Sequence, residues 1–224
     1  MCAAAPSLKQ PMIPKNIHIV WVGDETKRPD NCIATWISLN PTWSVKVWGN
    51  RELSEYPWIN KYHIEQMSQH EWCGVADLMR WEILYNLGGF ALDADSICLK
   101  ALPDWLLEHE IFASWENEIV RPNLIANGYV GSHAKNPLLG QIILDIHSEP
   151  SVVDRKAWIS TGPMRLTETW RKHKYNELSI LPSHYFIPNH FESPEYSGSG
   201  HVFAKQFWGA TRKNIYDELH LREF

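Results

Sequence analysis

The chain has 224 residues, of which 44% are hydrophobic, and its formal net charge at pH 7 is −5. This length and apolar content suffice for one hydrophobic core, so we expect a single domain over residues 13–224 after a loose segment at 1–12. The net negative charge argues against a nucleic-acid-binding protein, which would carry a basic surface. The sequence has no window of about 18 apolar residues, so it predicts no membrane span.

Strands and helices alternate along most of the sequence. In chain order we expect a strand at 16–23, a helix at 30–40, a strand at 43–48, helices at 57–69 and 74–87, strands at 90–95 and 110–116, and helices at 136–147 and 161–173. Asp30 is the expected helix cap, Gly49-Asn50 an expected turn, and Gly88-Gly89 the expected end of the fifth element. This alternation predicts an α/β fold with a parallel core sheet.

The cysteines and the first residues bear on where the protein works. Cys2, Cys32, Cys73 and Cys98 are scattered without CxxC spacing, which argues against a zinc cluster. The opening residues lack the charged and apolar regions of a signal peptide. We therefore expect reduced thiols and a cytoplasmic location.

Two carboxylates close the predicted strand at 90–95. Asp93 and Asp95 flank Ala94, so in a strand both would point to the same side of the sheet. The carboxyl end of a parallel strand is where α/β proteins place ligands. Two like charges at this point are tolerable if a hard divalent cation joins them, so Mg²⁺ or Mn²⁺ with a phosphate-bearing ligand is the expected partner. The other reading of the pair alone is a solvated turn.

The helix before this strand carries a second charged pair. Asp77 and Arg80 are spaced i, i+3 on one face. One reading is a surface ion pair of little energetic value. The other is a binding pair in which Asp77 accepts hydrogen bonds from sugar or ribose hydroxyls while Arg80 neutralises phosphate.

Three stretches together resemble a known family. They are "IPKNIHIVWVG", "ADLMRWEILYNLGGFALDAD" and "FAKQFWGAT", and they lie between about Ile13 and Tyr216. The sequence resembles the DXD-containing sugar-binding glycosyltransferases of the family 32 type, which are related to capsular-polysaccharide transferases and to large clostridial glucosylating toxins. The resemblance implies a GT-A fold, a nucleotide-sugar donor that is UDP-linked, a Mn²⁺ or Mg²⁺ ion, a glycan acceptor and retention of anomeric configuration.

The resemblance also assigns roles. Asp77, Arg80, Asp93 and Asp95 would carry the reaction, and Asp93 and Asp95 would hold the metal. The implied donor-binding residues are Val20, Trp21, Asp77, Arg80, Tyr85, Asp93, Lys205 and Trp208. The candidates on the acceptor side are Glu116, Asn117, Asn127 and Thr161, although Asn127-Gly128 is also a common turn dipeptide and Thr161 is also suited to an ordinary helix cap.

The C-terminal stretch departs from the family pattern. Where relatives carry a His, or an acid and a hydroxyl, as remaining metal ligands, this chain offers Gln206 and Thr211 as neutral oxygen donors. Two other functions therefore stay open: a non-catalytic nucleotide-sugar or carbohydrate-binding module, and, less in keeping with the position of the motif in the chain, an aspartyl-nucleophile phosphatase. The donor sugar is also open among UDP-glucose, UDP-galactose, UDP-N-acetylhexosamine and GDP-mannose.

Overall fold

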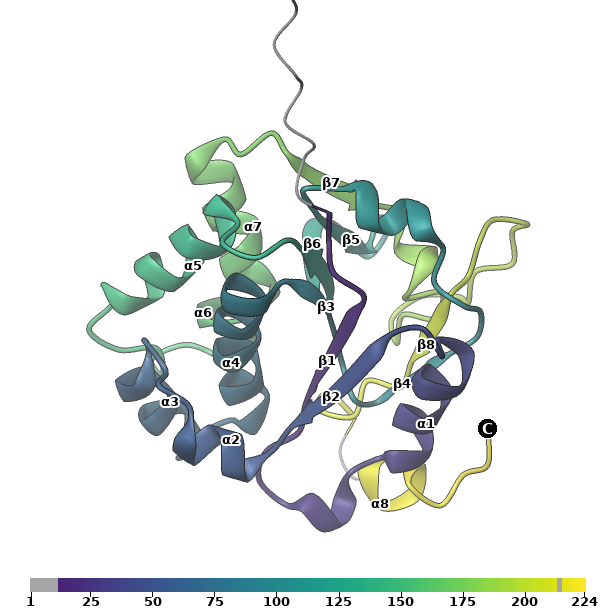
Figure 1. Cartoon of the computed structure of the whole chain (residues 1–224), viewed down its shortest axis with the longest axis horizontal. Helices are drawn as coiled ribbons and strands as arrows, with labels where there is room; N and C mark the ends of the chain where they lie inside the picture. The colour runs from purple at the N-terminus through teal and green to yellow at the C-terminus, as the bar shows by residue number, and fades with distance from the viewer. Residues whose placement is uncertain (1–11, 213–214) are drawn as a thin grey trace, which may run out of the picture.

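A six-stranded sheet lies at the centre of the computed structural model, which describes residues 12–212 and 215–224 (Figure 1). Its strand order is β2-β1-β3-β6-β5-β7. The strands are β1 (Asn16–Val20), β2 (Ser44–Trp48), β3 (Gly89–Leu92), β5 (Ile111–Asn117), β6 (Arg121–Ser132) and β7 (Leu178–Leu181). All neighbouring strands are parallel except at β6, which is antiparallel to both β3 and β5. The predicted α/β fold is confirmed, with a core sheet that is mostly parallel.

Two layers cover the sheet, one on each face (Figure 1). The helices are α1 (Asp30–Leu39), α2 (Asn50–Glu55), α3 (Lys61–Ser68), α4 (Trp72–Leu87), α5 (Pro137–His147), α6 (Ala157–Ser160), α7 (Pro163–His173) and α8 (Ile215–Leu219). The helices α3 to α7 gather on one side, whereas α1 lies on the other with a small antiparallel sheet of β4 (Ser96–Cys98) and β8 (Ala204–Gln206).

Successive side chains of the central strands point to opposite faces of the sheet, and each face has its own hydrophobic core. Along β3, Phe90 and Leu92 enter the core beneath α1, while Ala91 enters the core beneath α4 and α5. In β1, Ile17 and Ile19 join the first of these cores and Val20 joins the second. This is the pattern of a sheet that is buried on both faces, and it explains the continuous apolar character of these strands.

Several predicted boundaries were wrong. The expected helix at 57–69 is the shorter α3, and the expected turn at Gly49-Asn50 begins α2, whose first turn is closed by a hydrogen bond from the Gly49 N–H to Glu52 (3.0 Å). Asp30 does start α1, but its carboxylate pairs with Arg28 (2.6 Å) instead of capping the helix.

The strand β6 is the main element that the sequence did not predict. Asn127-Gly128, a potential turn, lies within this strand. The glycine is required there by a close approach, because a Cβ at Gly128 would lie 2.6 Å from an oxygen of Asp93.

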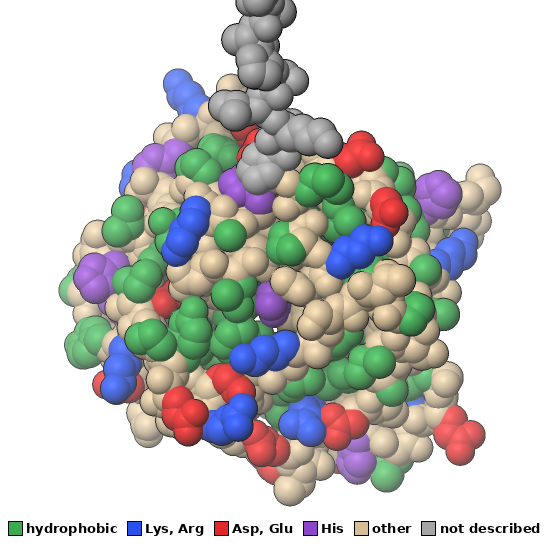
Figure 2. Space-filling view, in the orientation of Figure 1, with side chains coloured by type: hydrophobic (Ala, Val, Ile, Leu, Met, Phe, Trp, Pro, Cys, Tyr) green, Lys and Arg blue, Asp and Glu red, His purple; other side chains and the backbone are tan. Residues whose placement is uncertain are grey.

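The remaining global expectations concern membranes, thiols and charge. No helix in the described part of the chain combines the length and the apolar character needed to cross a bilayer. Cys32, Cys73 and Cys98 are free thiols, while Cys2 and the loose segment at 1–12, apart from Met12, lie outside the described residues. Acidic and basic side chains are interspersed on the face shown in Figure 2. The cytoplasmic location and the single-domain boundaries stay predictions.

Candidate active site

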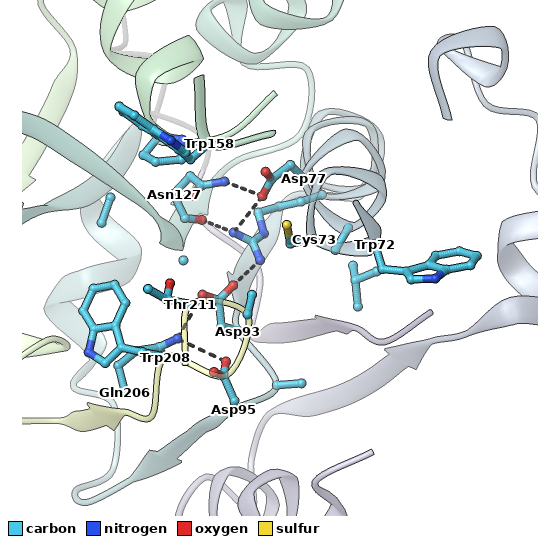
Figure 3. A pocket seen from close by; sticks show the side chains of 18 of the residues that line it. Trp72, Cys73, Asp77, Asp93, Asp95, Asn127, Trp158, Gln206, Trp208 and Thr211 are labelled. Atoms are coloured by element: carbon cyan, nitrogen blue, oxygen red, sulfur yellow. Dashed lines mark hydrogen bonds and ion pairs between the residues drawn. The ribbon is translucent and has the colours of Figure 1, made fainter. Parts of the chain in front are cut away.

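Asp93 and Asp95 lie directly after β3, at the floor of a cavity of about 710 Å³ (Figure 3). The sequence had suggested that both aspartates belong to the strand. The strand ends at Leu92, however, so they belong to the turn that leads into β4. The Asp93 N–H still donates to the Gly128 carbonyl oxygen of β6 (3.1 Å). Both side chains line the cavity. The two carboxylates therefore face the same site, as expected, although a turn and not a strand places them there.

Arg80 of α4 compensates the charge of Asp93. Its guanidinium is only 4% exposed, and it donates to the Asp93 carboxylate and to the Asn127 carbonyl oxygen. Asp77, one turn earlier, lies 3.9 Å from the same guanidinium and accepts a hydrogen bond from the Asn127 side chain (2.6 Å). The Asp77–Arg80 pair is therefore a buried network facing a cavity and not a surface ion pair.

Gln206 links the two aspartates. Its amide nitrogen lies 3.2 Å from Asp93 Oδ2 and 3.1 Å from Asp95 Oδ1, and its amide oxygen accepts a hydrogen bond from the Tyr129 hydroxyl (2.8 Å). This arrangement brings β8 onto the carboxylate turn. A residue 111 positions away in the sequence from Asp95 thereby becomes part of the same site.

A strained backbone completes the surroundings of Asp95. Trp208 has φ of +62°, a conformation that bulky L-residues rarely adopt, and the next residue, Gly209, donates its N–H to Asp95. The Trp208 indole is held in turn by a hydrogen bond to the Asn189 carbonyl oxygen (2.8 Å). Strain of this kind is typical of functional sites, where the surrounding contacts compensate its cost.

The electrostatics of the cavity favour a bound cation. Burial raises the pKa of Asp77 to about 7, and burial together with the nearby Asp93 charge raises that of Asp95 to about 7. Among the described residues that line the cavity, six are acidic and three basic, namely Asp24, Glu71, Asp77, Asp93, Asp95 and Glu116 against Lys27, Arg80 and Arg121. An anionic diphosphate would enter this acidic cavity only with a compensating cation.

The donor atoms fit a hard divalent ion. Asp93 and Asp95 offer carboxylate oxygens, and Thr211 offers a hydroxyl oxygen in the same cavity. Gln206, expected as a second neutral ligand, is turned the other way, because its amide oxygen accepts from Tyr129 and its amide nitrogen faces the two aspartates. No group of three His, Cys, Asp or Glu side chains with metal-binding geometry occurs within residues 12–212 and 215–224. A metal here would therefore be held by few protein carboxylates, with water or phosphate oxygens completing its shell, which suits Mg²⁺ or Mn²⁺.

Aromatic side chains form the other walls. Trp21, just after β1, packs edge-on against Tyr216 with a centroid distance of 5.0 Å, and its indole N–H donates to the Asp24 carbonyl oxygen (2.9 Å). Trp72 and Trp158 line the cavity and remain partly exposed, on different sides of the carboxylate turn (Figure 3). These two tryptophans had not been predicted as site residues, since nothing in their local sequence distinguishes them from the other ten.

Most predicted site residues meet in this one cavity. Those that line it are Val20, Trp21, Asp77, Arg80, Asp93, Asp95, Glu116, Asn127, Gln206, Trp208 and Thr211. Thr161 lies just behind the lining, where its hydroxyl lies 3.3 Å from Asp77 Oδ2.

Besides Thr161, three predicted site residues lie outside the cavity lining. The Tyr85 ring packs under the Lys135 ammonium, which lies 4.4 Å from the ring centroid. Lys205 pairs with Glu195 (2.9 Å), because adjacent residues of β8 point to opposite sides and Gln206 takes the inner one. Asn117 closes the turn after β5 by accepting hydrogen bonds from the N–H groups of residues 119 and 120 (3.0 Å each).

Comparison with known sequences finds similarity to glycosyltransferases. Residues 26–112 match the family described as "glycosyltransferase sugar-binding region containing DXD motif". The chain is 26% identical over 191 residues to an uncharacterized glycosyltransferase of Acanthamoeba polyphaga mimivirus, covering 79% of this chain and 74% of the relative. It is also 26% identical over 190 residues to inositol phosphoceramide mannosyltransferase 2 of Schizosaccharomyces pombe, with 79% and 51% coverage. The chain spans about half the length of its yeast relatives.

Solved structures share the fold at low sequence identity. The PaToxG glycosyltransferase superposes with a TM-score of 0.59 at 16% identity, over 72% of this chain and 69% of that one. The UDP-bound glycosyltransferase domain of the YGT toxin gives 0.56 at 9% identity, with 76% and 80% coverage. The galactosyltransferase LgtC, in complex with donor and acceptor sugar analogues, gives 0.52 at 11% identity, with 92% and 95% coverage. The sheet and its layers are therefore those of the GT-A fold.

Proposed function

We propose that this protein, whose residues 26–112 match a sugar-binding region of the DXD type, is a glycosyltransferase that moves a hexose or N-acetylhexosamine from a UDP-sugar to a hydroxyl group of a glycan or another acceptor. One observation carries the proposal. Asp93 is held by Arg80 on one side and linked to Asp95 through Gln206 on the other, at the floor of a large cavity. The UDP-bound toxin domain of the same fold supports the choice of nucleotide.

In this proposal the donor lies between the end of β1, the helix α4 and the turn that follows β3. Trp21, after β1, stacks on the base, because an indole offers a large flat face to a nucleobase. Asp77 accepts hydrogen bonds from the sugar hydroxyls and is kept in place by Asn127 and Arg80. Arg80 in turn fixes Asp93 and places positive charge beside the departing diphosphate, where negative charge develops.

A divalent metal is part of this proposal. Asp93 and Asp95 would hold Mn²⁺ or Mg²⁺, with the Thr211 hydroxyl as a neutral donor. Such an ion neutralises the charge that develops on a leaving diphosphate.

Retention of anomeric configuration is proposed from the family resemblance. The acceptor oxygen bonds to the anomeric carbon as the bond from that carbon to the diphosphate oxygen breaks, and the diphosphate takes the electron pair and the acceptor proton. Water must be kept away, since it would otherwise hydrolyse the donor. Trp208, which lines the cavity close to Asp95, is placed to cover the site during this step.

Turnover of a panel of nucleotide sugars tests the proposal. In the presence of Mn²⁺ we expect slow release of nucleoside diphosphate from one sugar donor and loss of that activity with EDTA, restored by added Mn²⁺. The panel contains UDP-glucose, UDP-galactose, UDP-N-acetylhexosamines and GDP-mannose. Binding of UDP without turnover of any donor would instead support a non-catalytic binding module, and turnover that survives EDTA would contradict the metal requirement.

A further inference from the structure

A second cavity lies beside β8, on the side that Lys205 faces. Its volume is about 420 Å³, which is within the range of about 300–1,000 Å³ that is usual for small-molecule pockets. Phe191 and Gln206 line both this cavity and the one at Asp93 and Asp95, so the two are neighbours. The donor occupies the cavity at the aspartates in the proposed reaction, which leaves the second cavity without a role.

The charge of the second cavity is opposite to that of the first. Its described lining contains three basic side chains and one acidic side chain, namely Lys205, Arg212 and Arg222 against Glu195. His190 also lines it, but burial lowers the pKa of His190, which favours the neutral imidazole. The chain as a whole has a net charge of −5, so its composition does not predict a basic cavity. An anion can therefore enter here without a metal ion.

The three basic side chains are only weakly neutralised by the protein. Lys205 Nζ lies 2.9 Å from a carboxylate oxygen of Glu195, whose side chain is 58% exposed. Arg222 lies 3.8 Å from the similarly exposed Glu218, and Arg212 forms no ion pair with a described residue. Exposed pairs of this kind contribute little energy, so a ligand that binds two guanidinium groups at once can replace them.

The backbone that carries the two arginines is held in place. The Asn31 side chain of α1 donates to the Arg222 carbonyl oxygen (2.7 Å), and the Arg222 guanidinium lies 5.7 Å from the centroid of the Phe207 ring. The Arg212 N–H donates to the Trp208 carbonyl oxygen (2.8 Å). This anchoring reduces the entropy that is lost when a ligand binds.

Charge narrows the class of ligand to a phosphate monoester. Three cations and one carboxylate leave two positive charges, and a phosphate monoester carries about −1.5 to −2 at pH 7. A carboxylate ligand would supply only one negative charge. Guanidinium groups also match the geometry of phosphate oxygens, with which they form paired hydrogen bonds.

The uncharged lining suits a sugar ring attached to this phosphate. Phe191 and Phe207 supply apolar walls, and aromatic walls pack well against sugar rings. Asn189 also lines the cavity, and its Oδ1 is buried without a hydrogen-bond partner among the described residues, because its amide nitrogen donates to the Gln206 carbonyl oxygen (2.8 Å). A ligand hydroxyl would satisfy this acceptor.

We propose that the second cavity is a binding site for a sugar phosphate, with the phosphate held by Lys205, Arg212 and Arg222 and the sugar ring against the aromatic wall. The site needs neither the metal nor the two aspartates. It therefore goes beyond the proposed function and stands or falls independently of it.

Calorimetric titration of the metal-free protein in EDTA tests this site. The probes are glucose 6-phosphate, inorganic phosphate and glucose. We expect one glucose 6-phosphate per chain, bound about fivefold or more tightly than inorganic phosphate and less tightly as salt is added, and no binding of glucose. Absence of glucose 6-phosphate binding, or an affinity no higher than that for inorganic phosphate or glucose, would overturn the assignment.

A phospholipid headgroup presents the same phosphate chemistry, so vesicles form a second arm of the test. Phosphatidylcholine vesicles that contain phosphatidic acid are sedimented with the protein. We expect no cosedimentation above that seen with phosphatidylcholine alone. Vesicle binding in the absence of glucose 6-phosphate binding would assign the basic cluster to a membrane surface and overturn the proposal.

Variants with effects of opposite sign separate a ligand site from general damage. The double variant Arg212→Gln with Arg222→Gln should weaken the binding of glucose 6-phosphate about tenfold or more. Glu195→Gln should strengthen it about threefold, because the variant removes the acid that competes for Lys205. Damage to the fold does not strengthen binding, so weaker or unchanged binding by Glu195→Gln would contradict the site.

Matched controls exclude a general effect of charge. The double variant Arg51→Gln with Arg155→Gln removes the same charge outside both cavities, and we expect it to change the Kd by less than about twofold. Asp95→Asn should likewise leave the Kd within about twofold, because Asp95 lines only the first cavity. A loss of binding in either control as large as that in the Arg212 and Arg222 variant would place the ligand elsewhere and refute the proposal.

Discussion

Replacement of Asp95 by asparagine is expected to abolish sugar transfer and at the same time to stabilise the metal-free protein at neutral pH. The activity should fall by about 10²–10³-fold or more, because a charged group at the diphosphate site is lost. The stability should rise because Asp95 is 5% exposed and lies beside Asp93, so its ionised form is unfavourable in the folded state without a cation.

The pH dependence follows from the raised pKa of Asp95. Between the ordinary value of 3.8 and about 7, the folded protein binds more protons at this site than the unfolded chain does. The free energy of unfolding of the wild type therefore falls as the pH rises through this window. An asparagine removes this loss, so the two proteins should differ little near pH 4 and most above pH 7.

Thermal unfolding without metal is the measurement for this variant. Above pH 7 we expect Asp95→Asn to gain about 1–3 kcal/mol, or about 2–4 °C in Tm for each kcal/mol. Asp104→Asn is the control, because Asp104 is on the surface, paired with Lys15. An Asp95→Asn variant that is less stable than the wild type at pH 7.5 would contradict this account of Asp95 as a carboxylate whose charge awaits a cation. A variant that still transfers sugar at the wild-type rate would contradict it as well.

Replacement of Arg80 by methionine is expected to abolish activity and, unlike Asp95→Asn, to destabilise the protein. The guanidinium is buried and neutralises Asp93 while lying 3.9 Å from Asp77. Removing one partner of a buried ionic network leaves uncompensated charge and costs about 3–5 kcal/mol. We therefore expect a marked fall in Tm together with loss of donor turnover.

Compensating and control variants show whether charge is the cause. The triple variant Arg80→Met with Asp77→Asn and Asp93→Asn should regain most of the lost stability and none of the activity. Arg51→Met should change the free energy of unfolding by less than about 1 kcal/mol, because Arg51 forms an exposed pair with Glu52. A triple variant as unstable as Arg80→Met would mean that packing, and not charge, explains the loss.

The centre of the site could be predicted because its signals are local. The residues of α4 and β3 are adjacent in the sequence, and the helical period, the closing glycines and the two aspartates all lie within 74–95. Tyr85 is an exception within this stretch, because it is five residues after Arg80 and thus about 140° round the helix at ~100° per residue. The family resemblance implied that Tyr85 binds the donor, but the helix geometry directs its side chain away from the cavity.

The rest of the site depends on contacts between distant segments. The strand β6 was missed because Asn127-Gly128 is also suited to a turn, and only the close approach of Asp93 to Gly128 explains the glycine. The pairing of β4 with β8 decides that Gln206 enters the site and Lys205 does not. The turn at Trp208 and the contact between His190 and Glu116 likewise arise from the folded loop, for which the local sequence carries no period.

Titration of Mn²⁺ into the metal-free protein, followed by electron paramagnetic resonance of the free ion, tests the central claim most directly. The account predicts that the wild type binds a single Mn²⁺, more tightly when UDP is present, and that Asp95→Asn loses this binding with and without UDP. Equal Mn²⁺ binding by the two proteins, or binding by the wild type that UDP does not strengthen, would contradict a shared site for the cation and the diphosphate at Asp93 and Asp95.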